Sequence, residues 1–429
     1  MRTLIKDLQD KQECEVRGFV ANIRDKRTMQ FIVIKDGSGK VQVTVEKEKY
    51  PEIAEVFSSL TINSVVYLKG TAYKNDFVKM GGIEIIPSSV EVVSAAEVSP
   101  IDETSSLDLK LDHRWLDLRT DRNYLLFVIQ SYFMQEMKNF LYNENFIEIH
   151  TPKIIGAASE SGADVFEVKY YDSKAYLSQS PQFYKQMAIA AGYERIFELA
   201  PAFRAEKSYT SRHCTEFTSF DLEFAYVDSY EDVMNMEERM LTYGLTKVKE
   251  KYGEIIKEVF DTEVVIPTLP FPRMKLADIY DELEARYGFK VPEEEKVDLN
   301  AEAERLTYKL AQDKFGHEFM FVVGYPAAKR AFYHMRDENG VLLGFDLIWR
   351  GVEITSGAQR EHRYEYIKKQ AEEKGLGKDV EFYLNFFKYG CPPHGGFAIG
   401  LERLTMLLLN IPTVKEAQFI FRGPNRVNP

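Results

Sequence analysis

The chain has 429 residues, 45% of them hydrophobic, and a formal net charge of −12 at pH 7. This length predicts two or three domains, and the acidic balance argues against a protein that coats nucleic acid through many non-specific phosphate contacts. No run of about 20 apolar residues is present, and the first residues carry scattered charges, so we expect a cytoplasmic protein without a membrane partner. Its three cysteines, Cys14, Cys214 and Cys391, lie too far apart in sequence to suggest a disulfide framework or a structural zinc site.

Five short strand-like segments follow one another between residues 13 and 93, with turn signals at residues 36–39 and 81–82. A helix-prone stretch follows the third segment. This order predicts an OB-fold β-barrel over residues 1–95, a shape that often binds single-stranded nucleic acid, although a barrel that serves only as a spacer is the alternative. We expect residues 96–125 to form a hinge or linker.

A long helix opens the larger part of the chain. Apolar residues recur at helical spacing from Leu126 onward, Thr120 or Asp121 can cap the helix, and the pattern ends near Asn143. An extended segment then reaches Pro152, which cannot donate to a strand ladder and therefore marks a sheet edge or an interface.

Residues 203–226 combine two strand-like segments with a cation-rich loop. At period two, Arg204 and Glu206 share one face of the first segment, and Asp221 and Glu223 share one face of the second, which predicts two half-buried strands. The loop between them carries cations and an aromatic ring: Lys207, Arg212, His213 and Phe217. Such a loop is suited to binding an anion.

The next helix begins at Ser180–Pro181 and places Gln182, Lys185 and Gln186 on one face. This polar face is either a solvated surface or part of a site. Further amphipathic helices, interleaved with strands, predict an α+β fold in which residues 126–429 form a mixed, mostly antiparallel sheet flanked by helices, with a helical insertion at about 228–315.

Near the end of the chain, a glycine-rich turn and a short strand lead into a helix with Glu402 and Arg403 in its first turn. An arginine there is disfavoured by the helix dipole, but it is suited to a bound phosphate. A surface ion pair is the alternative.

Three of these segments, in this order, resemble the three motifs of the class II aminoacyl-tRNA synthetases, and specifically of the archaeal-type aspartyl enzymes of subclass b. The long helix with the strand before Pro152 resembles the dimer-forming first motif. The FRAE, RHCTEF and DLE segments within residues 203–223 resemble the second motif, and GFAIGLERL at 396–404 resembles the third. The resemblance covers nearly the whole chain.

The resemblance implies a homodimer that activates L-aspartate with ATP and Mg²⁺, releases pyrophosphate, and transfers aspartate to the 3′ end of tRNA(Asp), possibly also of tRNA(Asn). It makes Arg204 and Arg403 the catalytic residues, because charge neutralisation and positioning carry this chemistry. The implied ATP ligands are Arg204, Glu206, Arg212, His213, Phe217, Glu353, Gly400, Leu401, Glu402 and Arg403. Phe217 and Arg403 would enclose the adenine.

The resemblance also assigns the remaining sites. The aspartate ligands would be Glu160, Gln182, Lys185, Arg204, Ser356 and Arg360, and the magnesium ligands would be Asp346, Glu353 and Ser356, which offer hard oxygen atoms. Phe31, Gln42 and Glu84 would contact the anticodon by stacking and hydrogen bonding.

Lys185 and Arg360 would select aspartate over asparagine, since two buried cations pair with a carboxylate but stay unpaired over a neutral amide. Asparaginyl relatives lack that lysine. An asparaginyl enzyme, an asparagine synthetase-like paralogue and an RNA-binding regulator are the alternatives. The C-terminal sequence departs from many relatives at Gly423.

Overall fold

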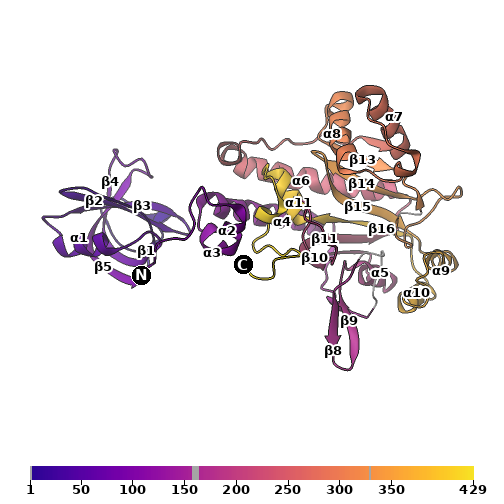
Figure 1. The fold of residues 1–429 in the computed structure, drawn as a ribbon, viewed down its shortest axis with the longest axis horizontal. Helices are drawn as coiled ribbons and strands as arrows, with labels where there is room; N and C mark the ends of the chain where they lie inside the picture. Colours follow the sequence, from indigo (N-terminus) through magenta and orange to yellow (C-terminus); the bar gives the residue numbers. More distant parts are fainter. Residues whose placement is uncertain (1, 157–163, 328–329) are drawn as a thin grey trace. The chain divides into compact units, whose positions relative to one another are not determined.

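The computed structural model describes residues 2–156, 164–327 and 330–429. Contacts between Cα atoms divide the chain into two compact units, Met1–Leu116 and Asp117–Pro429 (Figure 1). Among the described residues, no helix combines the length and the apolar character that crossing a bilayer requires.

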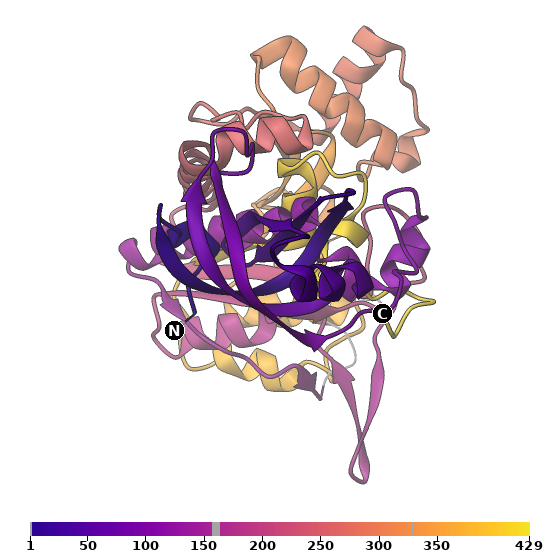
Figure 2. The same ribbon diagram turned by 90° about the vertical axis from the view of Figure 1, so that its left-hand side faces the viewer.

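The first unit is a closed five-stranded barrel in the order β1-β2-β3-β5-β4, which confirms the OB-fold (Figure 2). Alternate residues of the strands, such as Val16, Ile32 and Val43, are fully buried inside it. The elements are β1 (Gln12–Asp25), β2 (Met29–Asp36), β3 (Gly39–Glu46), α1 (Pro51–Ser59), β4 (Val65–Lys74) and β5 (Ile83–Ser94), after a short 3₁₀ turn at Ile5–Asp7. Two short helices follow the barrel: α2 (Leu107–Asp112) and α3 (Arg114–Asp117).

The second unit is built on an eight-stranded sheet in the order β12-β13-β14-β15-β16-β11-β10-β6. Only the outermost pairs, β12 with β13 and β10 with β6, are parallel, so the predicted mixed and mostly antiparallel sheet is confirmed. The strands are β6 (Ile147–Glu148), β10 (Arg195–Phe203), β11 (Glu216–Ala225), β12 (Arg273–Lys275), β13 (Phe319–Val323), β14 (Gly344–Trp349), β15 (Val352–Arg360) and β16 (His394–Gly400).

A separate three-stranded sheet, β7-β9-β8, ends in a hairpin that projects from the second unit (Figures 1 and 2). Its strands are β7 (Ile154–Ile155), β8 (Glu167–Tyr170) and β9 (Ser173–Leu177).

The helices cover the large sheet and fix its strands. The long helix α4 (Asp121–Asn143) begins as predicted, because the Thr120 side chain accepts a hydrogen bond from Asn123 N. It packs closely against α6 (Tyr230–Phe260), where Gly244 leaves room for the Phe133 ring. The remaining helices are α5 (Gln182–Ala190), α7 (Leu276–Tyr287), α8 (Ala301–Phe315), α9 (Tyr364–Glu373), α10 (Glu381–Phe387), α11 (Leu401–Leu408) and α12 (Val414–Ala417), with a 3₁₀ turn at Glu293–Glu295.

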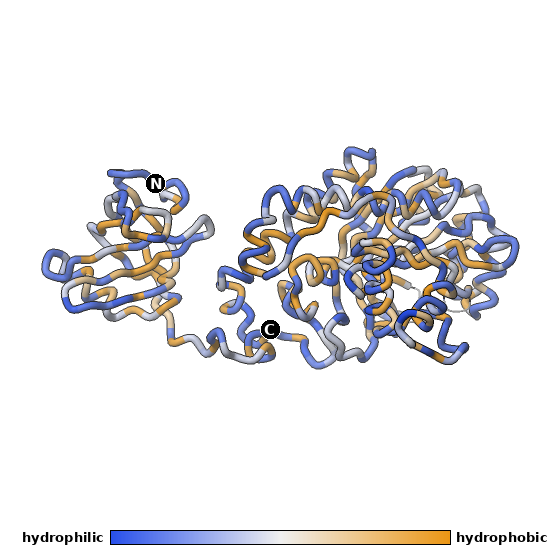
Figure 3. Tube along the Cα trace, turned by 90° about the horizontal axis from the view of Figure 1, so that it is seen from above, coloured by the Kyte–Doolittle hydropathy of each residue, from blue (hydrophilic) through white to orange (hydrophobic). Residues whose placement is uncertain are grey.

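Hydrophobic residues are concentrated along the helices and strands of each unit, and hydrophilic residues are frequent in the connecting loops (Figure 3). The largest core joins α4, α6 and α11 to the central strands. A second core joins α7 and α8 to β13 and β14.

The segment 203–226 differs from its predicted form in three respects. The first strand ends at Phe203, because Ala205 N donates to Asp164 O instead of to β11. The second strand is not half-buried: every residue from Ser219 to Phe224 is buried, since β11 lies in the middle of the sheet. It also ends at Ala225, because Tyr226 turns into the left-handed region with φ 61°.

Candidate active site

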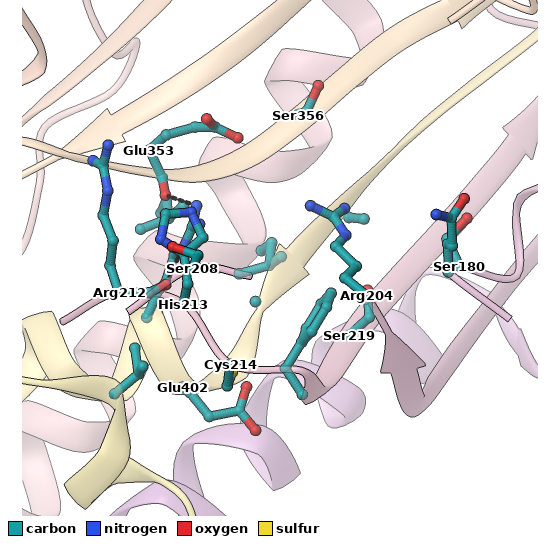
Figure 4. Close-up of a pocket in the computed structure, with 18 of the residues that line it drawn as sticks. Ser180, Arg204, Ser208, Arg212, His213, Cys214, Ser219, Glu353, Ser356 and Glu402 are labelled. Carbon is teal, nitrogen blue, oxygen red and sulfur yellow. Dashed lines mark hydrogen bonds between the residues drawn. The ribbon is translucent and has the colours of Figure 1, made fainter. Parts of the chain in front are cut away.

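Three segments that are distant in sequence form one pocket: the β10–β11 loop, strand β15, and the junction of β16 with α11 (Figure 4). The space within it, counted out into open solvent, is about 920 Å³. Ten of the predicted site residues line it: Arg204, Glu206, Arg212, His213, Phe217, Glu353, Ser356, Gly400, Glu402 and Arg403. The other lining residues were not among the predicted site residues: Gln179, Ser180, Ser208, Cys214, Ser219, Ile354, Ala398, Ile399 and Val414.

Three arginines place positive charge around this pocket. Arg204 and Arg212 come from the two ends of the loop and lie on different sides of the pocket (Figure 4). The Arg204 guanidinium lies over the Phe217 ring at 5.3 Å from its centroid. Arg403 donates to two backbone carbonyls, those of Arg212 at 3.2 Å and Glu353 at 2.9 Å. Such an arrangement can neutralise several phosphate oxygens.

His213 adds a neutral imidazole beside these three arginines. Burial, followed by the positive charges of Arg403, Arg212 and Arg204, lowers the pKa of His213 to about 4. Its Nδ1 is hydrogen-bonded to the Thr210 hydroxyl. The ring therefore stays uncharged near pH 7 and can contact a ligand as a hydrogen-bonding group.

Two residues of the glycine-rich junction have structural contacts. Glu402 lines the pocket, but its carboxylate accepts from Thr218 N at 3.0 and 3.2 Å and so ties α11 to β11. Leu401 is 8% exposed, belongs to the main core and does not line the pocket. In contrast, a Cβ atom added at Gly400 would have no neighbour within 4 Å, so the backbone there is open to a ligand.

The predicted magnesium ligands occupy two neighbouring strands. Glu353 and Ser356 lie on β15 and line the pocket, while Asp346 lies opposite Ser356 on β14. Burial and the charge of Asp346 raise the pKa of Glu353 to about 7. Asp346 is buried and pairs with both terminal nitrogens of Arg330, one of them at 3.0 Å.

Among the described residues, no group of three or more histidine, cysteine or acidic side chains could hold a metal by itself. The two carboxylates and the hydroxyl nevertheless fit Mg²⁺, which prefers oxygen ligands and takes the rest from water and phosphate. A divalent cation would also relieve the repulsion that raises the pKa of Glu353.

Behind the pocket, four charged side chains form a buried cluster. Lys185 Nζ lies 3.1 Å from Asp221 Oδ1 and 3.2 Å from Glu223 Oε2. Arg360 Nε donates to Glu223 Oε1 at 2.9 Å. All four are at most 3% exposed, and Ser219, which lines the pocket, connects to them through Asp221 Oδ2 at 2.5 Å.

The surroundings of Lys185 and Arg360 differ from those expected from the sequence. Both cations already have carboxylate partners, Asp221 and Glu223, two residues of a polar strand face for which no role was predicted. Arg360 and Lys185 keep the pKa of Glu223 lowered despite its burial. In the described part of the chain, one N–H of Lys185 and the NH1 group of Arg360 have no hydrogen-bond acceptor.

The polar face of α5 is buried, which excludes the solvated alternative. Gln182 Nε2 donates to Gln186 Oε1 at 2.8 Å, and the Tyr383 hydroxyl donates to the same oxygen at 2.9 Å. Gln186 also contacts His394 Nε2 at 2.9 Å. Burial lowers the pKa of His394 to about 4, so this layer around Lys185 is neutral. Glu160, the remaining predicted aspartate ligand, lies outside the described residues.

The predicted anticodon residues gather on the outside of the barrel. Gln42 on β3 lies opposite Glu84 on β5. The Thr44 hydroxyl accepts from Gln42 Nε2 at 3.1 Å and donates to Glu84 Oε2 at 2.5 Å. Phe31 on β2 lies opposite Thr44 on β3, and the Arg24 guanidinium lies over the Phe31 ring at 4.8 Å from its centroid. A stacking surface beside hydrogen-bonding groups suits unpaired bases.

Two family models match the chain: tRNA synthetases class II (D, K and N) over residues 106–421, and the OB-fold nucleic acid binding domain over residues 14–93. The aspartate–tRNA(Asp) ligase of Pyrococcus abyssi is 40% identical over 97% of this chain and 96% of its own. The aspartate–tRNA(Asp/Asn) ligase of Thermus thermophilus is 37% identical over 100% of both chains.

Solved structures show the same likeness. The asparaginyl-tRNA synthetase of Pyrococcus horikoshii, complexed with asparaginyl-adenylate, matches with a TM-score of 0.91 and 31% identity over 100% of both chains. The aspartyl-tRNA synthetase of Entamoeba histolytica matches with a TM-score of 0.87 and 30% identity over 100% of this chain and 93% of its own.

Proposed function

We propose that this chain, which belongs to the class II tRNA synthetases (D, K and N), is an aspartate–tRNA ligase. In the first step, a carboxylate oxygen of L-aspartate attacks the α-phosphorus of ATP and expels pyrophosphate, which gives aspartyl-adenylate. In the second step, a hydroxyl at the 3′ end of the tRNA attacks the adenylate carbonyl, and AMP leaves. Both steps build negative charge on phosphate oxygens, so the arginines around the pocket support the proposal.

The roles in the pocket follow from position. Arg204 binds the α-phosphate, and Arg212 and Arg403 bind the outer phosphates. Phe217 offers its ring to the adenine, and the open backbone at Gly400 allows the nucleotide to approach. Since the aspartate carboxylate is already a nucleophile, orientation and charge neutralisation carry the rate.

Magnesium fits this site through Glu353, Ser356 and Asp346. When bound, it would neutralise charge on the phosphate oxygens. Arg330 donates to both carboxylate oxygens of Asp346 and so orients that side chain.

The observation that carries the choice of aspartate is the buried cluster of Lys185 and Arg360. Their remaining N–H groups can each donate to an oxygen of the substrate side chain. A carboxylate accepts from both, whereas an amide has one oxygen and would set its NH₂ against a donor, which leaves a buried polar group unpaired. Donor and acceptor matching therefore replaces net charge as the basis of selection, because Asp221 and Glu223 balance the two cations.

The partner tRNA is tRNA(Asp), with tRNA(Asn) as a possible second substrate, and the barrel face around Phe31 binds the anticodon. The enzyme acts in the cytoplasm, where these substrates are used. Charging purified tRNA(Asp) and tRNA(Asn) side by side, with labelled aspartate and with labelled asparagine, tests the assignment. Aspartate on tRNA(Asp) supports it, and asparagine as the only transferred amino acid would identify an asparaginyl enzyme instead.

The active form is a homodimer. Two edge strands support this proposal, because large apolar side chains there are about half exposed: Ile147 on β6 at 50%, the neighbouring Tyr142 at 49%, and Ile154 on β7 of the small sheet at 48%. Apolar side chains at an open sheet edge favour self-association. Light scattering of the purified protein should give twice the mass of the chain.

A further inference from the structure

A glutamate of α8 lies beside the pocket without lining it. The Glu304 side chain is 5% exposed, and its Oε2 accepts from Arg212 NH1 at 2.5 Å and from the backbone N–H of Glu353 at 3.0 Å. These partners are 92 and 49 residues away in sequence. One carboxylate oxygen therefore joins the β10–β11 loop to strand β15.

Arg403 joins the same two residues from the other side. Its Nε donates to the Arg212 carbonyl and its NH1 to the Glu353 carbonyl. Glu304, Arg212, Arg403 and Glu353 thus form a closed ring of hydrogen bonds. Three of the four residues line the pocket, and Glu304 is the member that comes from the predicted helical insertion.

The position of Glu304 is fixed by close packing of α8. Gly351, in the β14–β15 turn, has φ +79°, and a Cβ atom there would lie 3.1 Å from Arg305 Cα, so the turn lies tightly against α8. The N-terminus of α8 is capped by the Asn300 side chain, which accepts from Glu302 N and Ala303 N. The Glu304 carboxylate is therefore not needed as a cap and is directed to Arg212 and Glu353.

We propose that Glu304 is a positioning residue for ATP, which holds the Arg212 guanidinium at the phosphate end of the pocket. Within the described residues, Arg212 gives only its NH1 group to a protein acceptor. Its other N–H donors remain available for phosphate oxygens. Without the carboxylate, the long arginine side chain would regain its rotamer freedom, and ATP would have to order it. This inference rests on the proposed function, in which Arg212 meets the phosphates.

ATP–pyrophosphate exchange by the full chain tests the proposal, with the KM values for ATP and aspartate measured separately. Glu304→Gln keeps an acceptor for Glu353 N but removes the charge that holds Arg212. Glu302→Gln is the matched control, because Glu302 is the other acidic residue of the first turn of α8 and is exposed. Glu304→Gln should raise the KM for ATP about tenfold, as expected for a lost charge-assisted hydrogen bond, and change the KM for aspartate less than twofold.

A double variant separates positioning from general damage. If Glu304 acts through Arg212, Arg212→Gln with Glu304→Gln should bind ATP no more weakly than Arg212→Gln alone. Calorimetric titration with ATP gives the same comparison without aspartate. Where Glu304→Gln does not fold, Glu304→Asp, which shortens the reach, takes its place with the same expectations.

The proposal is overturned if Glu304→Gln lowers the KM for ATP, because Glu304 would then compete with ATP for Arg212. It is also overturned if the KM values for ATP and aspartate rise together, or if Glu304→Gln behaves like Glu302→Gln. A wild-type protein without aspartate-dependent exchange would instead contradict the proposed function, so the two failures are distinguishable.

Discussion

Lys185 and Glu223 form an ion pair inside the protein, with Nζ and Oε2 3.2 Å apart and side chains that are 2% and 0% exposed. The pair exists because α5 lies against β11, so a helix face and a strand face that both look polar in sequence bury each other. A buried pair of this kind stabilises a fold little in net terms, but removal of one partner leaves a buried charge without compensation.

Lys185→Met should therefore destabilise the fold even though it is similar in size. We expect the free energy of unfolding to fall by about 3 kcal/mol, because Asp221 would lose its ion-pair partner and Glu223 would keep only Arg360. Urea unfolding measures this effect. Lys368→Met, on the exposed side of α9, should change the free energy by less than about 0.5 kcal/mol, and equal effects in both variants would refute the account.

Glu237 on α6 should make stability depend on pH. Its side chain is fully buried, and neither carboxylate oxygen has a hydrogen-bond partner among the described residues. Burial raises its pKa from 4.5 to about 8. As pH rises from about 4.5 to 8, the unfolded chain loses this proton first, so the stability present at low pH is lost through that window.

Glu237→Gln should remove this dependence. Relative to the variant, the wild type should lose about 1.4 kcal/mol of unfolding free energy per pH unit in the middle of the window. Unfolding curves from pH 5 to 8 provide the measurement, and Glu254→Gln on the exposed side of the same helix is the control. Parallel pH profiles for wild type and Glu237→Gln would contradict the assignment.

Alanine substitutions at two glycines of β16 should have different effects. A Cβ atom at Gly396 would collide with the Leu222 carbonyl and the Glu223 carboxylate, whereas one at Gly400 would meet nothing within 4 Å. Gly396→Ala should lower the free energy of unfolding by about 2 kcal/mol. Gly400→Ala should leave stability unchanged and raise the KM for ATP, because its methyl group would enter the pocket. Thermal unfolding measures stability, and ATP–pyrophosphate exchange gives the KM for ATP. If both variants lose stability to the same extent, β16 tolerates no added methyl group and the distinction is wrong.

Phe31→Ala should separate the two steps of the reaction. Loss of one stacked base is worth about 1–3 kcal/mol, so the KM for tRNA should rise about tenfold or more, while ATP–pyrophosphate exchange is unchanged. Val93→Ala, on the exposed end of β5, should affect neither. If exchange falls as much as charging, the proposed division between the barrel and the pocket is wrong.

Local patterns predicted much of this fold. The helical spacing from Leu126 with a cap at Thr120 gave α4 to within a residue, and alternating strands with glycine turns gave the closed barrel. The helix at Ser180–Pro181 begins one residue later than expected, at Gln182, although the Ser180 hydroxyl still accepts from Gln182 N at 3.1 Å. These features depend on near neighbours in sequence.

The parts that sequence reasoning missed depend on distant partners. Asp221 and Glu223 stood on the polar face of a strand, but their pairing with Lys185 and Arg360 spans 36 and 137 residues. Glu304 belongs to a helix whose apolar spacing indicates only packing. One signal was available, because buried charged groups need partners of opposite charge. Two carboxylates on one strand therefore suggest that two cations lie near them, but this rule does not say which cations.

Aspartate-dependent ATP–pyrophosphate exchange by the purified wild-type chain is the most direct test of the central claim, that this pocket activates aspartate. We expect exchange with aspartate and ATP to exceed exchange with asparagine by several hundredfold or more, because the asparagine amide leaves a buried donor unpaired in the Lys185 and Arg360 cluster. Exchange that proceeds equally well with asparagine, or that shows no dependence on aspartate, would contradict it.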